Sequence, residues 1–309
     1  MNSQNCVFLA PIVVFSYNRP DHLRQTLDAL SKNDLANKSV LYIYCDGVKD
    51  AASEEQRMRV EKNREVAHNA LGFKEVHVVE REHNVGLKGN IVGAVTEIVN
   101  QYGRIITLED DVVSSVGFLR YMNDALELYT DEERVMHISA YMYPHKCRLP
   151  KTFFYSVPYP GGGWATWKRA WDCYNDNSRE LYDYWKENWE TFDVFGGDYL
   201  SKQLKRNVDG TMDTWFIKWH AVMMQKGALT LYPGSSLTNN IGFDEMATNC
   251  YSTTKFDVIP VDYVKVEQSP LVVNKKASRV IYDFYQGHWY NRRRRRKLLS
   301  DVKKKLHLS

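Results

Sequence analysis

The sequence predicts an α/β fold with a mostly parallel sheet flanked by helices. Two observations predict it. Apolar runs of strand length alternate with amphipathic stretches of helix length through the first third of the chain, and this β-α-β rhythm is typical of a parallel sheet with helices on both faces. Apolar residues also make up 44% of the 309 residues, against 26% charged, so the chain can bury a sizeable core and is not disordered.

The first half contains four apolar runs that we expect to be strands, at residues 7–16, 40–45, 75–79 and 104–108. A helix with Leu23, Leu27 and Leu30 on its apolar face follows the first run. A capping box beginning at Ser53 opens a second helix, which continues to about Leu71. Two further helices are expected at residues 88–101 and 116–128.

The second half is less regular. Its expected elements are strands at 135–139 and 229–232, a helix at 214–224, a Trp-rich helix from Trp167 to about Tyr174, and a loop at 239–243. A turn-rich segment with three glycines ends at Trp164. No Pro/Ser linker or internal repeat separates the halves, so we expect residues 1–135 and 136–287 to pack as one domain, followed by a tail at 288–309.

Composition excludes several classes of protein. The longest nearly apolar run, from Val7 to Phe15, is about half the length that a membrane span needs. The amino terminus lacks the basic region of a secretory signal. The five cysteines are widely spaced and contain no CxxC, which argues against a disulfide framework and a structural zinc site. We therefore expect a cytoplasmic protein.

The charge of the chain is unevenly distributed. The last 22 residues hold nine Lys or Arg and one Asp, a net charge of +8, so the rest carries −5 because the whole chain is +3. As a helix, this tail would suit an anionic membrane surface, which leaves open a peripheral place at the inner face of the cell membrane. A solvated terminus is the alternative. An acidic body does not suit a polyanion, so we expect no nucleic-acid partner.

Polar residues follow each of the four expected strands: Asn18-Arg19, Asp46, Asn84 and Asp110-Asp111. Ligands of parallel sheets bind at the carboxyl ends of the strands, so these residues should converge on one crevice. Adjacent carboxylates repel one another unless a cation lies near. Glu109-Asp110-Asp111 therefore indicates either a site for Mg²⁺ or Mn²⁺ or a solvated acidic turn, and the triplet alone does not decide.

Other candidates each have a structural alternative. Asp46 precedes Gly47, so it suits a nucleotide ligand or a simple turn. Asp213 precedes a helix and suits a general base or a helix cap. Trp164, in the expected loop, is a better candidate for stacking on a sugar than Trp167 or Trp171, whose helical spacing core packing also explains.

The order of the motifs adds a further argument. FSYNRPDHLRQTLDAL, IYCDG, HNVGLKGN, ITLEDDVVSSVGFLRYMNDAL, HISAYM, PGGGWATWKRAW, MDTWFIKW and NNIGFDEMATN follow one another along the chain. In this order they resemble the GT-A nucleotide-sugar glycosyltransferases, namely the N-acetylglucosaminyltransferase I-like group and related bacterial polysaccharide glycosyltransferases. The resemblance covers roughly residues 10–250.

The resemblance implies a GT-A, Rossmann-like fold in which residues 1–135 bind the nucleotide sugar and the α+β half at 136–287 binds the acceptor. Asp111 then matches the ligand of Mn²⁺ or Mg²⁺, and Asp110 lies beside the ribose and donor sugar. Asp46 matches the acid that reads uracil, which points to a UDP-sugar. Arg19 and Lys88 match basic residues near the diphosphate.

For the reaction, the resemblance implies that Asp213 is the catalytic base, with Asp244 and Glu245 as fallbacks because Thr214 replaces a second acid of the family. One base opposite a metal-bound leaving group gives a single displacement with inversion. The implied activity is transfer of a sugar from a UDP-sugar to a hydroxyl of a glycan or lipid-linked glycan in bacterial cell-surface polysaccharide synthesis. The donor sugar, the acceptor and the linkage stay open.

Two other classes of protein are alternatives to a glycosyltransferase. A nucleotidyltransferase would need a glycine-rich phosphate loop after the first strand, and FSYNRP has none. A non-catalytic glycan-binding or scaffold protein would not need both the carboxylate triplet and Asp213. A glycosyltransferase is therefore the hypothesis that the sequence favours.

Overall fold

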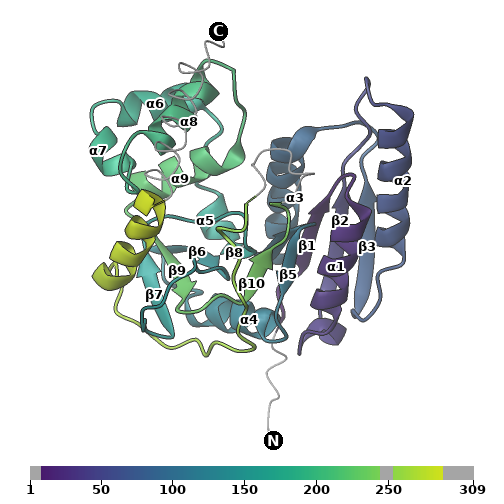
Figure 1. The fold of residues 1–309 in the computed structure, drawn as a ribbon, viewed down its shortest axis with the longest axis horizontal. Coiled ribbons are helices and arrows are strands. Elements are labelled where there is room, and N and C mark those ends of the chain that lie inside the picture. Colours follow the sequence, from purple (N-terminus) through teal and green to yellow (C-terminus); the bar gives the residue numbers. More distant parts are fainter. Residues whose placement is uncertain (1–7, 244–252, 288–309) are drawn as a thin grey trace, which may run out of the picture.

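The computed structural model describes residues 8–243 and 253–287 (Figure 1). Its centre is an eight-stranded sheet with the order β3-β2-β1-β4-β8-β6-β9-β7. The strands are β1 (Ile12–Ser16), β2 (Val40–Cys45), β3 (Glu75–Glu80), β4 (Arg104–Glu109), β6 (Val135–Ser139), β7 (Thr152–Tyr155), β8 (Trp164–Trp167) and β9 (Leu229–Pro233). Within the described residues, all of these strands except β7 and β8 run in one direction. The expected α/β fold with a mostly parallel sheet is confirmed, and it is Rossmann-like.

The central strands are apolar on both sides because both faces of the sheet are covered. In β1, Val13 and Phe15 point into one core, and Ile12 and Val14 point into the other. Their side chains alternate because successive residues of a strand face opposite ways. Ile12 pairs with Leu41 of β2 and with Ile106 of β4, so β1 lies between them.

Helices cover each face. α1 (Pro20–Ser31), α2 (Glu54–His68) and α4 (Phe118–Leu128) pack on one face. α3 (Gly86–Tyr102) and α9 (Trp215–Gln225) pack on the other. Ser53 and Gln56 form the predicted capping box of α2. α3 ends at Gly103, whose φ of 76° suits a glycine better than any other residue.

The Trp-rich helix predicted from Trp167 to about Tyr174 forms only in part. Trp164 to Trp167 form β8, and only the short α5 (Lys168–Trp171) follows. Trp164 points into one core, whereas Ala165 and Trp167 point into the other, as in a strand. Four residues are too few for periodicity to separate strand from helix. Pairing of β8 with β4, some 60 residues earlier in the chain, decides its conformation.

The second half contains more structure than its sequence pattern suggests. α6 (Ser178–Trp185), α7 (Trp189–Phe192) and α8 (Tyr199–Val208) form a helical group beside α9, seen at the upper left of Figure 1. The expected loop at 239–243 begins with β10 (Thr238–Asn240), which pairs with β5 (Val112–Ser114). A 3-10 turn, η1, spans Ala36–Lys38. A helix at 275–287, drawn in yellow, packs Ala277 and Ile281 into the core.

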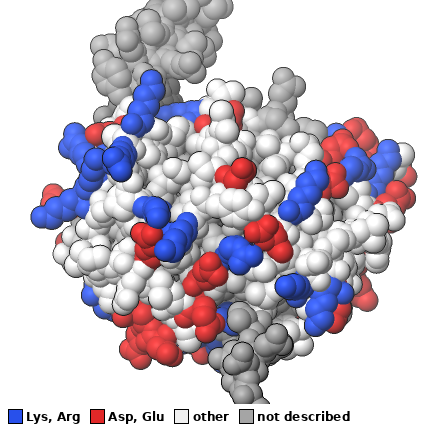
Figure 2. Space-filling model, turned by 90° about the horizontal axis from the view of Figure 1, so that it is seen from below, with Lys and Arg blue, Asp and Glu red and all other residues white. Residues whose placement is uncertain are grey.

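One sheet contains strands from both halves of the chain, so the two halves share its hydrophobic cores. The basic tail at 288–309 and the fallback bases Asp244 and Glu245 lie outside the described residues. In the part of the chain that is described, no helix is long and apolar enough to cross a membrane. On the face in Figure 2, basic and acidic side chains are interspersed.

Candidate functional site

Of the polar residues expected to meet at the carboxyl ends of the strands, those that follow β1 and β4 lie close together. Phe15 pairs with Glu109 in the parallel register, so the residues that follow both strands leave the sheet at the same edge. Pro20 is the first residue of α1, where its fixed φ and missing N–H are tolerated. This start makes Arg19 the N-cap residue and brings its side chain to the end of β4.

Arg19 joins two carboxylates of the triplet. Its Nη2 atom donates to Asp111 Oδ2 at 2.8 Å and also to Asp110 Oδ1. Asp110 and Asp111 are 3% and 7% exposed. The backbone of Asp110 is held in turn by Thr26 of α1, whose hydroxyl donates to the Asp110 carbonyl at 2.8 Å. The structure therefore brings the predicted residues Arg19, Asp110 and Asp111 into one buried cluster.

The carboxylates of the cluster outnumber its one guanidinium, and their pKa values respond to this imbalance. Burial raises the pKa of Glu109 and of Asp110 above the usual range, and the neighbouring carboxylates raise both further. Arg19 opposes these shifts, because its guanidinium favours the charged carboxylates. One guanidinium faces three carboxylates, so the cluster is electrostatically suited to a further cation.

A segment from the second half of the chain closes over the cluster. Asn240 lies at the end of β10, and its Nδ2 atom donates to Asp111 Oδ1 at 3.1 Å and to the Gly161 carbonyl at 2.9 Å. The N–H of Ile241 donates to the Asp111 carbonyl at 2.8 Å. Asn240 is not among the residues that the sequence predicts for this site. The doublet Asn239-Asn240 before Ile241-Gly242 was the available signal, but only the β5–β10 pairing shows which carboxylate it meets.

Asp46 has a structural role at the end of β2. Its Oδ1 atom accepts hydrogen bonds from the N–H groups of Gly47 and Val85, and its Oδ2 atom accepts from the N–H of Gly86 and from Asn84 Nδ2, all at 2.8–3.0 Å. These four bonds fill the acceptor sites of a carboxylate. They also fix the beginning of α3. Reading a uracil ring stays a prediction, and it would require Asp46 to give up one of these bonds.

Lys88 lies in α3, and Asp213 comes shortly before α9. The fold places their side chains next to each other. Lys88 Nζ lies 3.0 Å from Asp213 Oδ2 and 2.9 Å from Asp176 Oδ2. Lys218 Nζ, on α9, lies 3.1 Å from Asp213 Oδ1 and 2.7 Å from Asp176 Oδ1. We call these four residues the charge quartet. Burial alone would raise the pKa of Asp213, but the two ammonium groups outweigh it and lower the pKa.

The prediction for Trp164 needs correction. It lies in β8 rather than in a loop, and it is 3% exposed. Its ring stacks on His137, with centroids 5.1 Å apart, and on Trp215, also at 5.1 Å. Because the side chain is buried among these rings, it is not exposed for stacking on a sugar. Trp171 is buried in the same core, as the core-packing alternative expected.

The residues near Asp111 suit a divalent cation only with help from a substrate. Within the described residues, no group of three His, Cys, Asp or Glu side chains is arranged to hold a metal ion. Mg²⁺ commonly takes one or two carboxylates and completes its shell with waters and substrate phosphates. Among the described residues, each side-chain oxygen of Asp111 accepts one hydrogen bond, so within this part of the chain both keep acceptor capacity. The donor set therefore fits a cation shared with a diphosphate.

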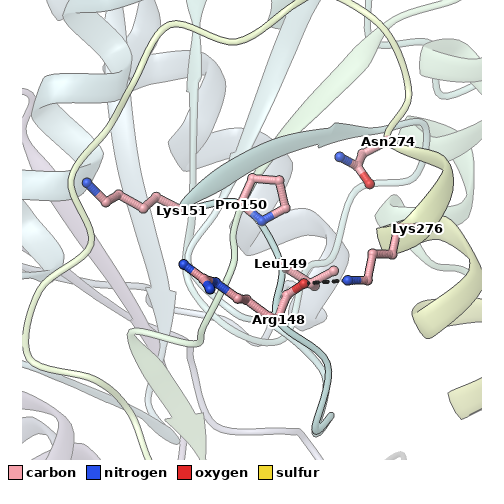
Figure 3. Close-up of a pocket in the computed structure, with 6 residues that line it drawn as sticks. All are labelled: Arg148, Leu149, Pro150, Lys151, Asn274 and Lys276. Atoms are coloured by element: carbon pink, nitrogen blue, oxygen red, sulfur yellow. Dashed lines mark hydrogen bonds between the residues drawn. The ribbon is translucent and has the colours of Figure 1, made fainter.

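A hollow of about 530 Å³ lies elsewhere on the molecule, beside the edge strand β7 (Figure 3). Arg148, Lys151 and Lys276 are among its lining residues. Lys276 Nζ donates to the Arg148 carbonyl at 2.8 Å, and Lys151 pairs with Glu267 at the same distance. Two of its three cations already have partners within the protein, and we assign it no ligand.

Comparison with known proteins gives no family. The chain matches no protein-family model and no curated protein sequence. Among solved structures it resembles S. aureus TarS (16% identity, TM-score 0.30, covering 48% of this chain and 24% of TarS) and the same protein's residues 1–349 (13%, 0.40, covering 76% and 61%). It also resembles a cytidylyltransferase from Leptospira borgpetersenii serovar Hardjo-bovis (12%, 0.33, covering 59% and 72%). The chain thus spans about a quarter and three fifths of the two TarS chains. At these TM-scores the likeness carries no argument about function.

Proposed function

We propose that this protein is a glycosyltransferase that moves a sugar from a UDP-sugar to a hydroxyl of a glycan acceptor. The observation that carries the proposal is the buried cluster of Arg19, Asp110 and Asp111 at the carboxyl ends of β1 and β4. This edge of a Rossmann-like sheet is where nucleotides bind. The motif order quoted above gives the sugar-transfer assignment.

The charged residues of the cluster suit UDP, the leaving group of this reaction. Breaking the bond between the sugar and the phosphate leaves negative charge on UDP. When bound, Mn²⁺ or Mg²⁺ would stabilise that charge as a Lewis acid, with Asp111 as its protein ligand. Arg19 Nη2 already donates to Asp110 and Asp111, so the phosphates would bind the other N–H groups of this guanidinium at the same place.

Asp213 is the proposed general base. Its side chain is 63% exposed, so an acceptor hydroxyl has access to it. Lys88 and Lys218 keep it ionised, and an ionised carboxylate can take the hydroxyl proton as the oxygen attacks the anomeric carbon. Attack from the face opposite the leaving UDP gives inversion. The acceptor, in this proposal, is a glycan or lipid-linked glycan of a bacterial cell-surface polysaccharide.

The test is a screen of UDP-GlcNAc, UDP-galactose, UDP-glucose and UDP-GalNAc with Mn²⁺, measuring released UDP. We expect one donor to give turnover. Asp213→Asn should bind that donor as wild type does but transfer about 10²- to 10⁴-fold more slowly, as removal of a base does. The control is Asp183→Asn, since Asp183, which is half exposed, forms a surface pair with Lys186 at 3.2 Å in the described part of the chain.

Two outcomes would contradict the proposal. Glycan binding without UDP release from any donor would favour a non-catalytic glycan-binding protein. Full activity of Asp213→Asn would place the base elsewhere, with Asp244 and Glu245 as the next variants to measure.

A further inference from the structure

The charge quartet is asymmetric. The Lys218 side chain is 3% exposed, whereas those of Lys88, Asp176 and Asp213 are 22%, 53% and 63% exposed. A buried ammonium group is costly unless it is paired. Lys218 donates to both carboxylates, at 2.7 Å to Asp176 and 3.1 Å to Asp213. The core therefore fixes the position of Lys218, whereas the carboxylates of Asp176 and Asp213, to which it donates, face solvent.

Three separate parts of the chain meet in the quartet. Lys88 comes from the first turn of α3, Lys218 from α9, and Asp176 from the segment between α5 and α6. Tyr174 adds one more bond, because its hydroxyl donates to Asp176 Oδ1 at 3.2 Å. This hydroxyl, the two ammonium groups and Asp176 are the titratable groups around Asp213 in the described residues.

We propose that Lys218 and Asp176 are positioning residues for Asp213: Lys218 orients its carboxylate, and Asp176 shares the positive charge of both lysines. The inference deepens the proposed function and rests on it. Two ammonium groups facing a single carboxylate would make that carboxylate a weak base. The carboxylate of Asp176 makes the charge quartet neutral overall, so Asp213 retains basicity. The hydrogen bond from Lys218 keeps the Asp213 carboxylate in a fixed direction.

Substitutions of Lys218 and of Asp176 should shift the pH profile of kcat in opposite directions. Lys218→Met keeps most of the buried stem but removes one ammonium group, so the pKa of Asp213 should rise and the acidic limb of kcat should move to higher pH. Asp176→Asn leaves both ammonium groups on Asp213, so the pKa should fall further. Its acidic limb should move to lower pH, and kcat at neutral pH should fall because the base is weaker.

The experiment measures kcat between pH 2.5 and pH 8, because the pKa of Asp213 lies below its usual value, together with the dissociation constant of the UDP-sugar, for wild type, Lys218→Met, Lys218→Arg and Asp176→Asn. We expect kcat at pH 7 to fall about 10- to 100-fold in Lys218→Met, since a misdirected catalytic group costs about that much. The donor dissociation constant should stay within about twofold of wild type. Lys218→Arg, which keeps the charge, should restore part of the rate.

Lys168→Met and Asp172→Asn are the matched controls. They break a Lys–Asp pair of the same length, 2.7 Å, on the exposed side of α5, and they should leave kcat and its pH profile unchanged. Should Lys218→Met fail to fold, Asp176→Asn carries the test alone, because Asp176 is half exposed and Asn has the same shape.

The outcomes separate the two proposals. Wild-type protein that transfers no sugar would overturn the proposed function and this inference with it. In an active protein, variants of Lys218 and Asp176 that keep the wild-type kcat and pH profile would overturn the inference alone. Shifts of the acidic limb in opposite directions would support it.

Discussion

Gly242 lies directly over the carboxylate of Asp111. A Cβ atom at this glycine would be 2.0 Å from Asp111 Oδ2 and 2.9 Å from Arg19 Nη1. Backbone and carboxylate therefore meet without room for any side chain. The loop after β10 acts as a wall of the cluster, so the second half of the chain helps to form the candidate nucleotide site.

We expect Gly242→Ala to impair the site more than the fold. The added methyl group must displace the Asp111 carboxylate or the loop, and donor binding should weaken about tenfold or more if a catalytic group is misplaced. Isothermal titration with UDP and Mn²⁺ measures this. Gly93→Ala is the control, because its Cβ would have its nearest neighbour at 3.8 Å and it lies in α3, where alanine is preferred to glycine. Equal binding by the two variants would show that the loop can move aside.

Asp111 should be needed for metal-dependent binding of the nucleotide. Asp111→Ala should abolish UDP-sugar turnover and the enhancement of UDP binding by Mn²⁺, while the circular dichroism spectrum stays that of wild type. Removal of the metal with EDTA should abolish turnover of the wild-type protein, and Mn²⁺ in excess should restore it. Full activity in EDTA would exclude the metal and leave Arg19 as the only cation in contact with Asp111 in the described residues.

Asp46 should contribute to the stability of the fold through its hydrogen bonds at the end of β2. Asp46→Ala removes an acceptor from three backbone N–H groups and Asn84, all between 2.8 and 3.0 Å. Loss of a charged acceptor in a buried place should lower the free energy of unfolding by about 2–3 kcal/mol. Urea denaturation measures it. A variant with wild-type stability and weaker UDP binding would instead assign Asp46 to the uracil ring.

The elements that the sequence predicts well are those whose pattern is local. β2 and β6 have the predicted bounds, and the capping box of α2 forms as expected. Their apolar runs or caps need no distant partner to be recognised. Parallel strands present their carboxyl ends at one edge, and two pairs of strand ends meet there: Arg19 reaches Asp110 and Asp111, and Asn84 reaches Asp46. Convergence of all four strand ends on one crevice stays a prediction.

Features that depend on distant pairing are missed. Trp164 becomes part of a strand because β4 lies beside it, and no pattern within four residues reveals that. Asp46 precedes a glycine and suggests a simple turn, but its partners are N–H groups at the start of α3, about 40 residues away. Asn240 and Lys218 gain their roles only through contacts with Asp111 and Asp213. Sequence spacing alone contains none of these distances.

Two buried histidines should make the protein less stable in acid. His137 and His220 are fully buried, and burial lowers the pKa of His137 to about 3 and that of His220 to about 4. In the unfolded chain both have a pKa of about 6.5, so between these limits the unfolded state binds more protons than the folded state. The free energy of unfolding should therefore fall as pH decreases below about 6.5, by up to about 1.4 kcal/mol per pH unit for each histidine.

Urea denaturation at pH 7, 6 and 5 measures the slope, and His220→Asn should flatten it even where it lowers stability at pH 7. The same slope in wild type and His220→Asn would show that other groups control the loss of stability in acid.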